Sequence, residues 1–293
     1  KLIQGDGSIG SKLISFDQIS GVAFTGSSAT AKKINLQLAK KDGPISSLIA
    51  ETGGLNAMFI DSSSLHEQVV DDIMRSSFNS AGQRCSALRL AIIHESIFDD
   101  LVEMIKDAMA ELTVGNPEDF HCDVGPIIDE RSRNMLLEYI SECSNNGYQV
   151  FSHNQAPDGN FVSPTLIELN SIDDINEEKF GPILHVIKYK TDELDQILNA
   201  LKNKQYGLTM GVHSRIESKA DDIINKSIAG NTYINRDIVG AVVGSQPFGG
   251  TGLSGTGFKA GGPNYLLQFV DERSITKNTV AFGGNAEILN LED

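Results

Sequence analysis

The sequence predicts an α/β fold built on a largely parallel sheet. Short apolar runs of strand length alternate with longer segments in which apolar residues recur at helical spacing, and glycines mark many of the boundaries. Strands that alternate with helices in this way usually pair in parallel, because each helix carries the chain back along a face of the sheet. With 293 residues the chain can bury a large core, in two packed lobes or one large domain.

The first elements expected are a strand, a turn and a helix. Residues 21–25, Gly-Val-Ala-Phe-Thr, predict a strand, and after a Gly-Ser-Ser turn a helix is expected from about residue 29 to 40. An apolar run at 46–50 leads into Glu51-Thr-Gly-Gly, and Ala-Met-Phe-Ile-Asp at 57–61 predicts another short strand. Two glycines therefore interrupt the chain directly beside Glu51.

The middle of the chain places a cysteine between a helix and a strand. Apolar residues at helical spacing predict a helix over 64–78, and Gly82 ends that pattern. A strand is expected at 88–94, so Cys85 lies in the junction between the two elements. Amphipathic helices are expected at 98–112 and around 135–143, and Cys143 falls on the apolar face of the second.

The last third continues the alternation and then becomes rich in glycine. Strands are expected at 183–189 and 230–234, a helix at 194–201, and a final strand at 269–280. The glycine-rich segment 237–263 has the composition of a flexible linker. Its valines, Pro247 and Phe248 favour a loop packed around a ligand instead, because a linker of glycine and serine would lack them.

Composition excludes several classes of function. The 39 acidic and 24 basic residues give a formal net charge of −15, which repels nucleic acid. The three cysteines show no CxxC spacing, which argues against a disulfide framework or a zinc site, so we expect no metal and a reducing, cytoplasmic location. No apolar run is long enough to cross a membrane, and residues 1–10 lack the layout of a signal peptide.

Cys85 and Glu51 are the candidate catalytic residues. Cys85 sits in a turn, Gly-Gln-Arg-Cys-Ser-Ala, which favours exposure, although a lone cysteine is more often a small core residue than a nucleophile. Glu51 has apolar neighbours and two adjacent glycines, and desolvation there would suit a general base, although a solvated glutamate is commoner. His185, in an apolar run, is expected to be a packed core histidine, and Cys122 has no visible partner.

Taken together, these motifs resemble the aldehyde dehydrogenase superfamily over essentially the whole chain. Glu51-Thr-Gly-Gly and Gly82-Gln-Arg-Cys are similar to the family's two active-site signatures. Six further matches follow in the family's order: FTGS at 24–27, VGNP at 114–117, VGP at 124–126, EKFGP at 178–182, YGLT at 206–209 and PFGG at 247–250.

The resemblance implies a catalytic domain of that fold, plus the end of an incomplete Rossmann-like domain that binds a dinucleotide. Cys85 would add to an aldehyde carbon, and Glu51 would activate the water that hydrolyses the resulting thioester. NAD is the implied cofactor. Gly26 and Ser27 resemble the turn that meets its pyrophosphate at a helix N-terminus, and Glu178 and Phe180 resemble the pair beside the nicotinamide riboside.

The glycine-rich segment resembles specifically that of glutamate-semialdehyde (1-pyrroline-5-carboxylate) dehydrogenases, and the tail at 272–286 resembles the continuation found in bifunctional proline utilization A. The resemblance implies that backbone amides around Gly240 and Ala241 bind the substrate's α-carboxylate. Ser86 would add a hydroxyl donor, and Phe248 would pack on the aliphatic part of the substrate.

The same resemblance predicts three parts of a larger protein. They are the end of an NAD-binding domain at 1–54, a catalytic domain at 55–267, and an oligomerisation strand and tail at 268–293. Upstream NAD-domain and proline dehydrogenase segments would be partners, with FAD confined to the latter and absent from this chain. We expect a homo-oligomer, and we expect the isolated chain to lack dehydrogenase activity because the adenosine-binding residues and one oxyanion donor lie upstream.

Two readings from other classes compete with the dehydrogenase. The chain could be a non-catalytic structural or interaction unit, since fold alone does not imply function. It could also be a cysteine esterase with Glu51 as base, which would cleave esters without a cofactor and form no NADH. The preference for NAD over NADP depends on residues that meet the adenine ribose, which the resemblance places upstream.

Overall fold

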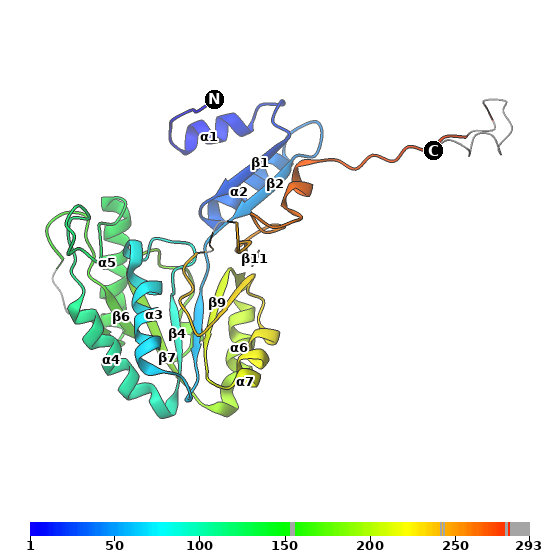
Figure 1. Cartoon of the computed structure of the whole chain (residues 1–293). Coiled ribbons are helices and arrows are strands. Elements are labelled where there is room, and N and C mark those ends of the chain that lie inside the picture. The colour runs from blue at the N-terminus through cyan, green and yellow to red at the C-terminus, as the bar shows by residue number, and fades with distance from the viewer. Residues whose placement is uncertain (153–155, 241, 243, 279–280, 282–293) are drawn as a thin grey trace.

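The computed structural model describes residues 1–152, 156–240, 242, 244–278 and 281. It has a lower part around one large sheet and a smaller upper part that carries both ends of the chain (Figure 1). Within the described residues, no helix is long and apolar enough to cross a membrane.

The lower part is organised by a seven-stranded sheet. Its order is β10-β9-β3-β4-β7-β6-β5, and every neighbouring pair is parallel except β5 with β6 at the edge. The strands span Ala57–Ile60 (β3), Leu90–His94 (β4), Gln149–Phe151 (β5), Thr165–Glu168 (β6), Ile183–Tyr189 (β7), Thr209–His213 (β9) and Asn231–Ile234 (β10). The largely parallel α/β sheet expected from the sequence is confirmed.

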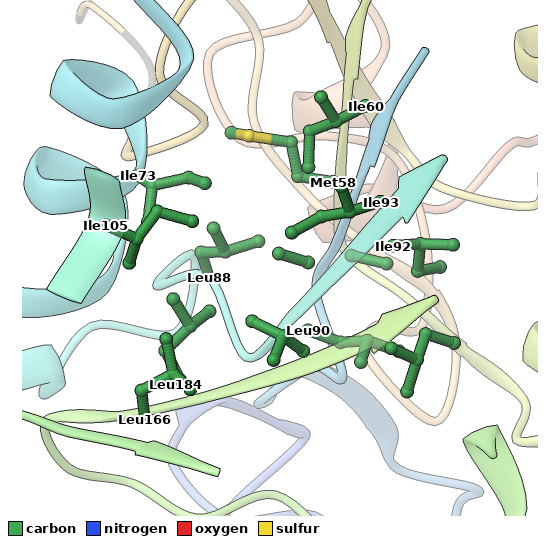
Figure 2. Close-up of a cluster of buried hydrophobic side chains, with 14 of the residues drawn as sticks. Met58, Ile60, Ile73, Leu88, Leu90, Ile92, Ile93, Ile105, Leu166 and Leu184 are labelled. Atoms are coloured by element: carbon green, nitrogen blue, oxygen red, sulfur yellow. The ribbon is translucent and has the colours of Figure 1, made fainter. Parts of the chain in front are cut away.

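The central strands are apolar because both of their faces are covered. All four residues of β3 are buried, as are the first four of β4. Figure 2 shows Ile73 of α3 and Ile105 of α4 gathered with Leu88 and side chains of the strands. Each such side chain contributes roughly 1.5 to 3 kcal/mol when it leaves water, so these strands form a firm base for the loops that enter them.

The helices flank this sheet. They span His66–Phe78 (α3), Phe98–Glu111 (α4), Glu130–Asn145 (α5), Leu194–Asn203 (α6) and Glu217–Lys226 (α7). Short 3-10 turns at Asn79–Gly82, Glu95–Ile97, Ile172–Asp174, Thr191–Glu193 and Tyr265–Phe269 join or end elements. Figure 1 places α3, α4 and α5 toward one end of the sheet and α6 and α7 toward the other. Helical spacing in the sequence predicted α3, α4, α5 and α6, but it did not identify α7.

The upper part is smaller and more exposed. Strands β1 (Gly21–Thr25) and β2 (Ser47–Glu51) pair in parallel, with α2 (Ser28–Ala39) between them in sequence and α1 (Gly7–Ile14) before them. Residues alternate between exposed and half-buried along β1. The short strands β8 (Tyr206–Gly207) and β11 (Thr251–Gly252) pair antiparallel.

One expected element is wrong. The sequence predicted a strand at 269–280, but residues 270–278 have no regular secondary structure and extend from the upper part into solvent (Figure 1). A strand is defined by pairing, and no other strand of this chain lies alongside that segment within the described residues. Residues 279–280 lie outside the described residues.

Candidate active site

The candidate site lies where the chain enters the sheet. The segments that lead into β3, β4, β7 and β9 carry Glu51, Cys85, Glu178 and Tyr206 respectively. Because these four strands are parallel neighbours, their amino ends meet at one edge. The topology therefore gathers residues that are far apart in sequence.

Cys85 sits in a turn that backbone contacts hold tightly. Gly82 adopts a φ of +64°, and a Cβ there would overlap the carbonyl oxygen of Gly181, so only glycine fits. The Asn56 side chain donates to the carbonyls of Cys85 at 2.7 Å and Ala87 at 2.8 Å. Its Oδ1 accepts from the backbone N–H of Thr209 at 3.1 Å. One amide side chain thus joins the turn to β9.

The environment of Cys85 raises the pKa of its thiol. The side chain is half-buried and forms no disulfide. Burial raises its pKa, and the negative charges of Glu178 and Glu51 raise it further, while the N–H groups of Ser86 and Cys85 itself oppose this. Cys85 therefore lies within electrostatic reach of both carboxylates that the sequence singled out.

Glu51 ends β2 and has few polar partners. Burial raises the pKa of its carboxyl, while the Gly250 N–H and the charge of Lys259 lower it. The Gly250 N–H donates to Oε2 at 3.4 Å, and Oε1 is buried with no hydrogen-bond partner among the described residues. A desolvated carboxylate with a free oxygen has the character expected of a general base.

Glu178 is seated between a glycine and an arginine. A Cβ on Gly53 would overlap its Oε2, so the carboxylate lies directly against the backbone beside Glu51. Its Oε1 accepts from Arg89 Nη2 at 3.1 Å, and the two side chains are 16% and 1% exposed. Burial raises the pKa of Glu178, and the Arg89 charge opposes the rise.

The residues predicted to bind substrate are tied to the nucleophile turn. Ser86 is 2% exposed, and its hydroxyl accepts from the Gly240 N–H at 2.9 Å. The loop is further held by the bond from Ile238 N–H to Ser76 Oγ, so it is not a free linker there. Val242 is 61% exposed, and Ala241 lies outside the described residues.

Phe248 and Lys259 belong to one turn beside Glu51. Phe248 and Ala260 exchange two backbone hydrogen bonds, at 3.0 and 2.9 Å. This pairing places Gly249 against both Glu51 and Lys259, because a Cβ there would lie 3.2 Å from Glu51 Oε1 and from Lys259 Cα. Burial lowers the pKa of Lys259, and Glu51 opposes that change.

The predicted cofactor turn is open to solvent. Ser27 is exposed and caps α2, with its hydroxyl accepting from the Thr30 N–H at 3.2 Å. The Gly26 N–H donates to the Glu51 carbonyl at 3.1 Å, which joins this turn to the end of β2. Phe180 is 45% exposed beside the Arg89 guanidinium, 5.3 Å from the ring centroid.

Residues judged structural from the sequence are structural here. Cys143 is buried on α5, and His185 is buried with both ring nitrogens bonded, to Tyr139 Oη at 2.8 Å and to the Arg89 carbonyl at 2.9 Å. Burial lowers the pKa of His185 to about 4, so the ring is neutral at neutral pH. Cys122 Sγ lies 3.1 Å from the Gly115 carbonyl, in a separate loop.

Sequence reasoning missed three residues that shape the site, namely Asn56, Arg89 and Lys259. Arg89 left a readable signal, because it is the one charged residue within the apolar run at 87–93. A buried charge in a strand almost always has a partner, and such a residue could have been noted for that reason. Asn56 and Lys259 stand among glycines and small residues and left no comparable signal.

Comparison with known proteins identifies relatives across nearly the full chain. The model of the aldehyde dehydrogenase family matches residues 1–275. The Klebsiella aerogenes bifunctional protein PutA is 44% identical over 285 residues, covering 93% of this chain and 22% of that protein. The 1-pyrroline-5-carboxylate dehydrogenase of Bacillus subtilis is 34% identical over 285 residues, covering 94% and 54%. The chain therefore spans less than two thirds of the length of these relatives.

Solved structures agree with these matches. A crystal structure of bifunctional proline utilization A superposes with a TM-score of 0.91 at 50% identity, covering 95% of this chain and 28% of that one. A 1-pyrroline-5-carboxylate dehydrogenase gives a TM-score of 0.84 at 30% identity, covering 91% and 52%. The fold described above is thus that of these proteins.

Proposed function

Because this chain belongs to the aldehyde dehydrogenase family, we propose that it takes part in the NAD-dependent oxidation of L-glutamate γ-semialdehyde to L-glutamate in proline catabolism. Relatives named as PutA and 1-pyrroline-5-carboxylate dehydrogenase support this substrate. The observation that carries the proposal is that the segments carrying Glu51, Cys85 and Glu178 enter the parallel neighbouring strands β3, β4 and β7 at one edge of the sheet, with Glu178 lying against Gly53 beside Glu51.

The first step is addition of the Cys85 sulfur to the aldehyde carbon. The thiol proton passes to solvent water as the S–C bond forms, and the carbonyl oxygen takes up negative charge. The N–H groups of Cys85 and Ser86 favour negative charge on the sulfur, and we propose that the Cys85 N–H also donates to the oxygen as it develops charge. Donors fixed in advance in this way stabilise a tetrahedral adduct.

The second half of the reaction uses Glu51. The adduct carbon loses a hydride and becomes a thioester, which water must cleave to release glutamate and restore the thiol. Glu51 removes a proton from that water, and its unpartnered Oε1 is the atom free to do so. Its raised pKa makes it a stronger base than an exposed glutamate, at the cost of needing a higher pH to ionise.

The residues present fit a dinucleotide. The exposed N-terminus of α2 behind Gly26 and Ser27 offers free amides to a pyrophosphate, and Glu178, held on Gly53, would accept from ribose hydroxyls. Phe180 is exposed enough to pack beside a nicotinamide. When bound, NAD supplies the acceptor for the hydride. The amide of Gly240 already bonds Ser86, so we propose that a substrate carboxylate binds further along this loop, with Phe248 on the aliphatic chain.

The experiment compares two substitutions. The protein tested is this chain, expressed with any sequence that flanks it in its gene. Cys85→Ala should abolish NADH formation from glutamate semialdehyde, whereas Glu51→Gln should still form the adduct but release glutamate slowly. Cys122→Ala is the matched control, since that cysteine lies in a separate loop. Turnover by Cys85→Ala above about a tenth of the unsubstituted rate, a barrier change under about 1.4 kcal/mol, would reject the proposal.

Two controls separate the competing classes. An esterase would cleave an activated ester at equal rate with and without NAD and would form no NADH, and a non-catalytic unit would show no Cys85-dependent reaction.

Light scattering on the purified protein tests the predicted homo-oligomer. A cytoplasmic location stays a prediction that rests on three unpaired cysteines.

A further inference from the structure

We propose that Arg89 is a positioning residue that couples the nucleophile turn to the carboxylate of Glu178. The inference deepens the proposed function and rests on it, because it assigns Cys85 as nucleophile and Glu178 as the cofactor-binding acid. Arg89 is among the largest fully buried side chains of the chain, with 1% of its surface exposed. A cation so deeply buried needs partners to offset its lost hydration, and here Nη1 and Nη2 supply all four side-chain bonds while Nε has no partner among the described residues.

The guanidinium reaches two separate segments. Nη1 donates to the carbonyl of Gly82 at 2.7 Å and to that of Gly181 at 3.1 Å. Nη2 donates to the carbonyl of Arg84 at 3.2 Å and to Glu178 Oε1 at 3.1 Å. Gly82 and Arg84 lie immediately before Cys85, so two of the four bonds fix the nucleophile turn and two fix the loop of Glu178.

Only arginine has the shape for this arrangement. Its planar fork presents donors in several fixed directions, whereas the ammonium of lysine is a single point charge on a flexible stem. The surrounding backbone is closely packed, because Gly82 meets the Gly181 carbonyl and Gly53 meets the Glu178 carboxylate without room for a Cβ. Glu178 therefore cannot move away from Arg89 toward Gly53.

The arginine itself is held from behind. Its carbonyl accepts from the N–H of His185 and contacts His185 Nδ1 at 2.9 Å, and the other ring nitrogen bonds Tyr139 Oη. On the open side, the guanidinium lies over the Phe180 ring. His185 of strand β7, which Tyr139 of helix α5 holds in turn, thus fixes the Arg89 backbone, and the Phe180 ring lies against the guanidinium.

The charges explain why this position matters to chemistry. Glu178 disfavours the Cys85 thiolate, while Arg89 attracts both of these anions. The Arg89 charge lowers the pKa of Glu178 against the rise that burial causes, and its bond to Oε1 orients that carboxylate for a ligand. Removing the guanidinium would leave a buried carboxylate unpaired, a change that strongly destabilises such sites.

The test measures the pH dependence of Cys85 alkylation by iodoacetamide without NAD, in a background carrying Cys122→Ser and Cys143→Ala so that only Cys85 reacts. To isolate the cation from the carboxylate, Arg89→Met is compared with its parent in a Glu178→Gln background. There the alkylation midpoint should move to higher pH, because the thiolate loses its nearby cation. Arg75→Met, an exposed arginine on α3, is the control and should leave the midpoint unchanged.

A second measurement is NAD affinity by calorimetry with Glu178 intact. Arg89→Lys keeps the charge but loses the fork, so the midpoint should stay near that of the parent while NAD binding weakens by about tenfold or more. If Arg89→Met fails to fold, the NAD affinity of Arg89→Lys still tests the proposal. An unmoved midpoint in Arg89→Met, or unchanged NAD affinity in Arg89→Lys, would overturn the proposal. Alkylation needs neither NAD nor aldehyde, so failure of the proposed function is distinguishable.

Discussion

The nucleophile and the cofactor turn are built in opposite ways. Cys85 lies in a turn anchored by two buried polar side chains, Asn56 and Arg89, on strands that are buried on both faces. Gly26 and Ser27 lie on the small upper part, where β1 alternates between exposed and half-buried residues and Ser27 is exposed. One end of the site is part of the core, and the other is part of the surface.

This difference matches what each end must do. A nucleophile has to meet an aldehyde carbon at one distance and angle, and bonds within the core fix that geometry. A large cofactor has to enter and leave, so its phosphate site needs free amides that face solvent. Glu51 stands between the two ends, since it closes β2 and its carbonyl accepts from Gly26. Substitutions on the two sides should therefore have unequal effects.

The largest effect is expected from Asn56→Ala. Two carbonyls lose a donor and the Thr209 N–H loses an acceptor, and each buried unsatisfied group costs about 1 to 3 kcal/mol, so unfolding free energy should fall by about 3 kcal/mol. Urea denaturation measures it. Asn231→Ala is the matched control: that asparagine also bonds a carbonyl and an N–H, those of Pro247 and Gly249, but nearer the surface. Equal losses would remove the contrast between core and surface.

Gly53→Ala should change the position of the Glu178 carboxylate and leave the free energy of unfolding nearly unchanged. The new Cβ would push the carboxylate off its position, so NAD affinity should weaken by about tenfold, which is about 1.4 kcal/mol. Calorimetry with NAD measures the change. Gly115→Ala, at a glycine with open space around it, should leave NAD affinity as it is. Unaltered NAD affinity in Gly53→Ala would mean that NAD binding does not depend on this position of Glu178.

Ser27→Ala tests the surface end. Loss of the N-cap should cost about 1 kcal/mol of unfolding free energy, as measured by denaturation. Ser27→Asp restores a capping oxygen but adds negative charge where a pyrophosphate would bind, so it should keep stability and lose NAD affinity. If Ser27→Asp binds NAD as well as the unsubstituted chain does, the phosphate lies elsewhere.

The smallest effect is expected from Lys259→Met. The Lys259 charge lowers the pKa of Glu51 against the larger effect of burial, so its removal should raise that pKa further. A base works in its ionised form, and the acidic limb of the pH profile for thioester hydrolysis should therefore move to higher pH. Lys259→Arg keeps the charge and should leave the limb near its original place. A limb that moves to lower pH would contradict the assigned role of Lys259.

Much of the fold could be predicted from the sequence, because local patterns of apolar residues determine which segments form strands and helices. The strands at Ala57–Ile60 and Ile183–Tyr189 and the helix at Phe98–Glu111 follow from apolar runs and helical spacing. The segment 269–280 shows the limit: its apolar residues resemble a strand, but a strand needs a neighbour, and residues 270–278 pair with no strand in the part of the chain that the structure describes. Local composition predicts a tendency, whereas pairing depends on what lies alongside.

The candidate site likewise contains residues that local motifs identify and residues whose contacts depend on the order of the strands. Cys85 and Glu51 could be chosen because each stands in a short motif with chemical meaning. Arg89 and Glu178 are 89 residues apart, and their ion pair exists only because β4 and β7 are neighbours in the sheet. The partner of Ser86 was also not readable, since Gly240 reaches it from 154 residues away. Contacts across the sheet depend on strand order, which no local pattern encodes.

The placement of the site at the amino ends of the strands has a practical consequence for attaching this protein to a surface. The turns at the opposite ends, such as Thr191–Glu193 after β7, carry none of the candidate site residues, and Thr191 is exposed. An azide-bearing residue introduced at Thr191 would react with an alkyne-coated electrode and leave the Cys85 thiol untouched. The molecule would then be immobilised with its candidate active site facing the solution, an orientation suited to an amperometric sensor.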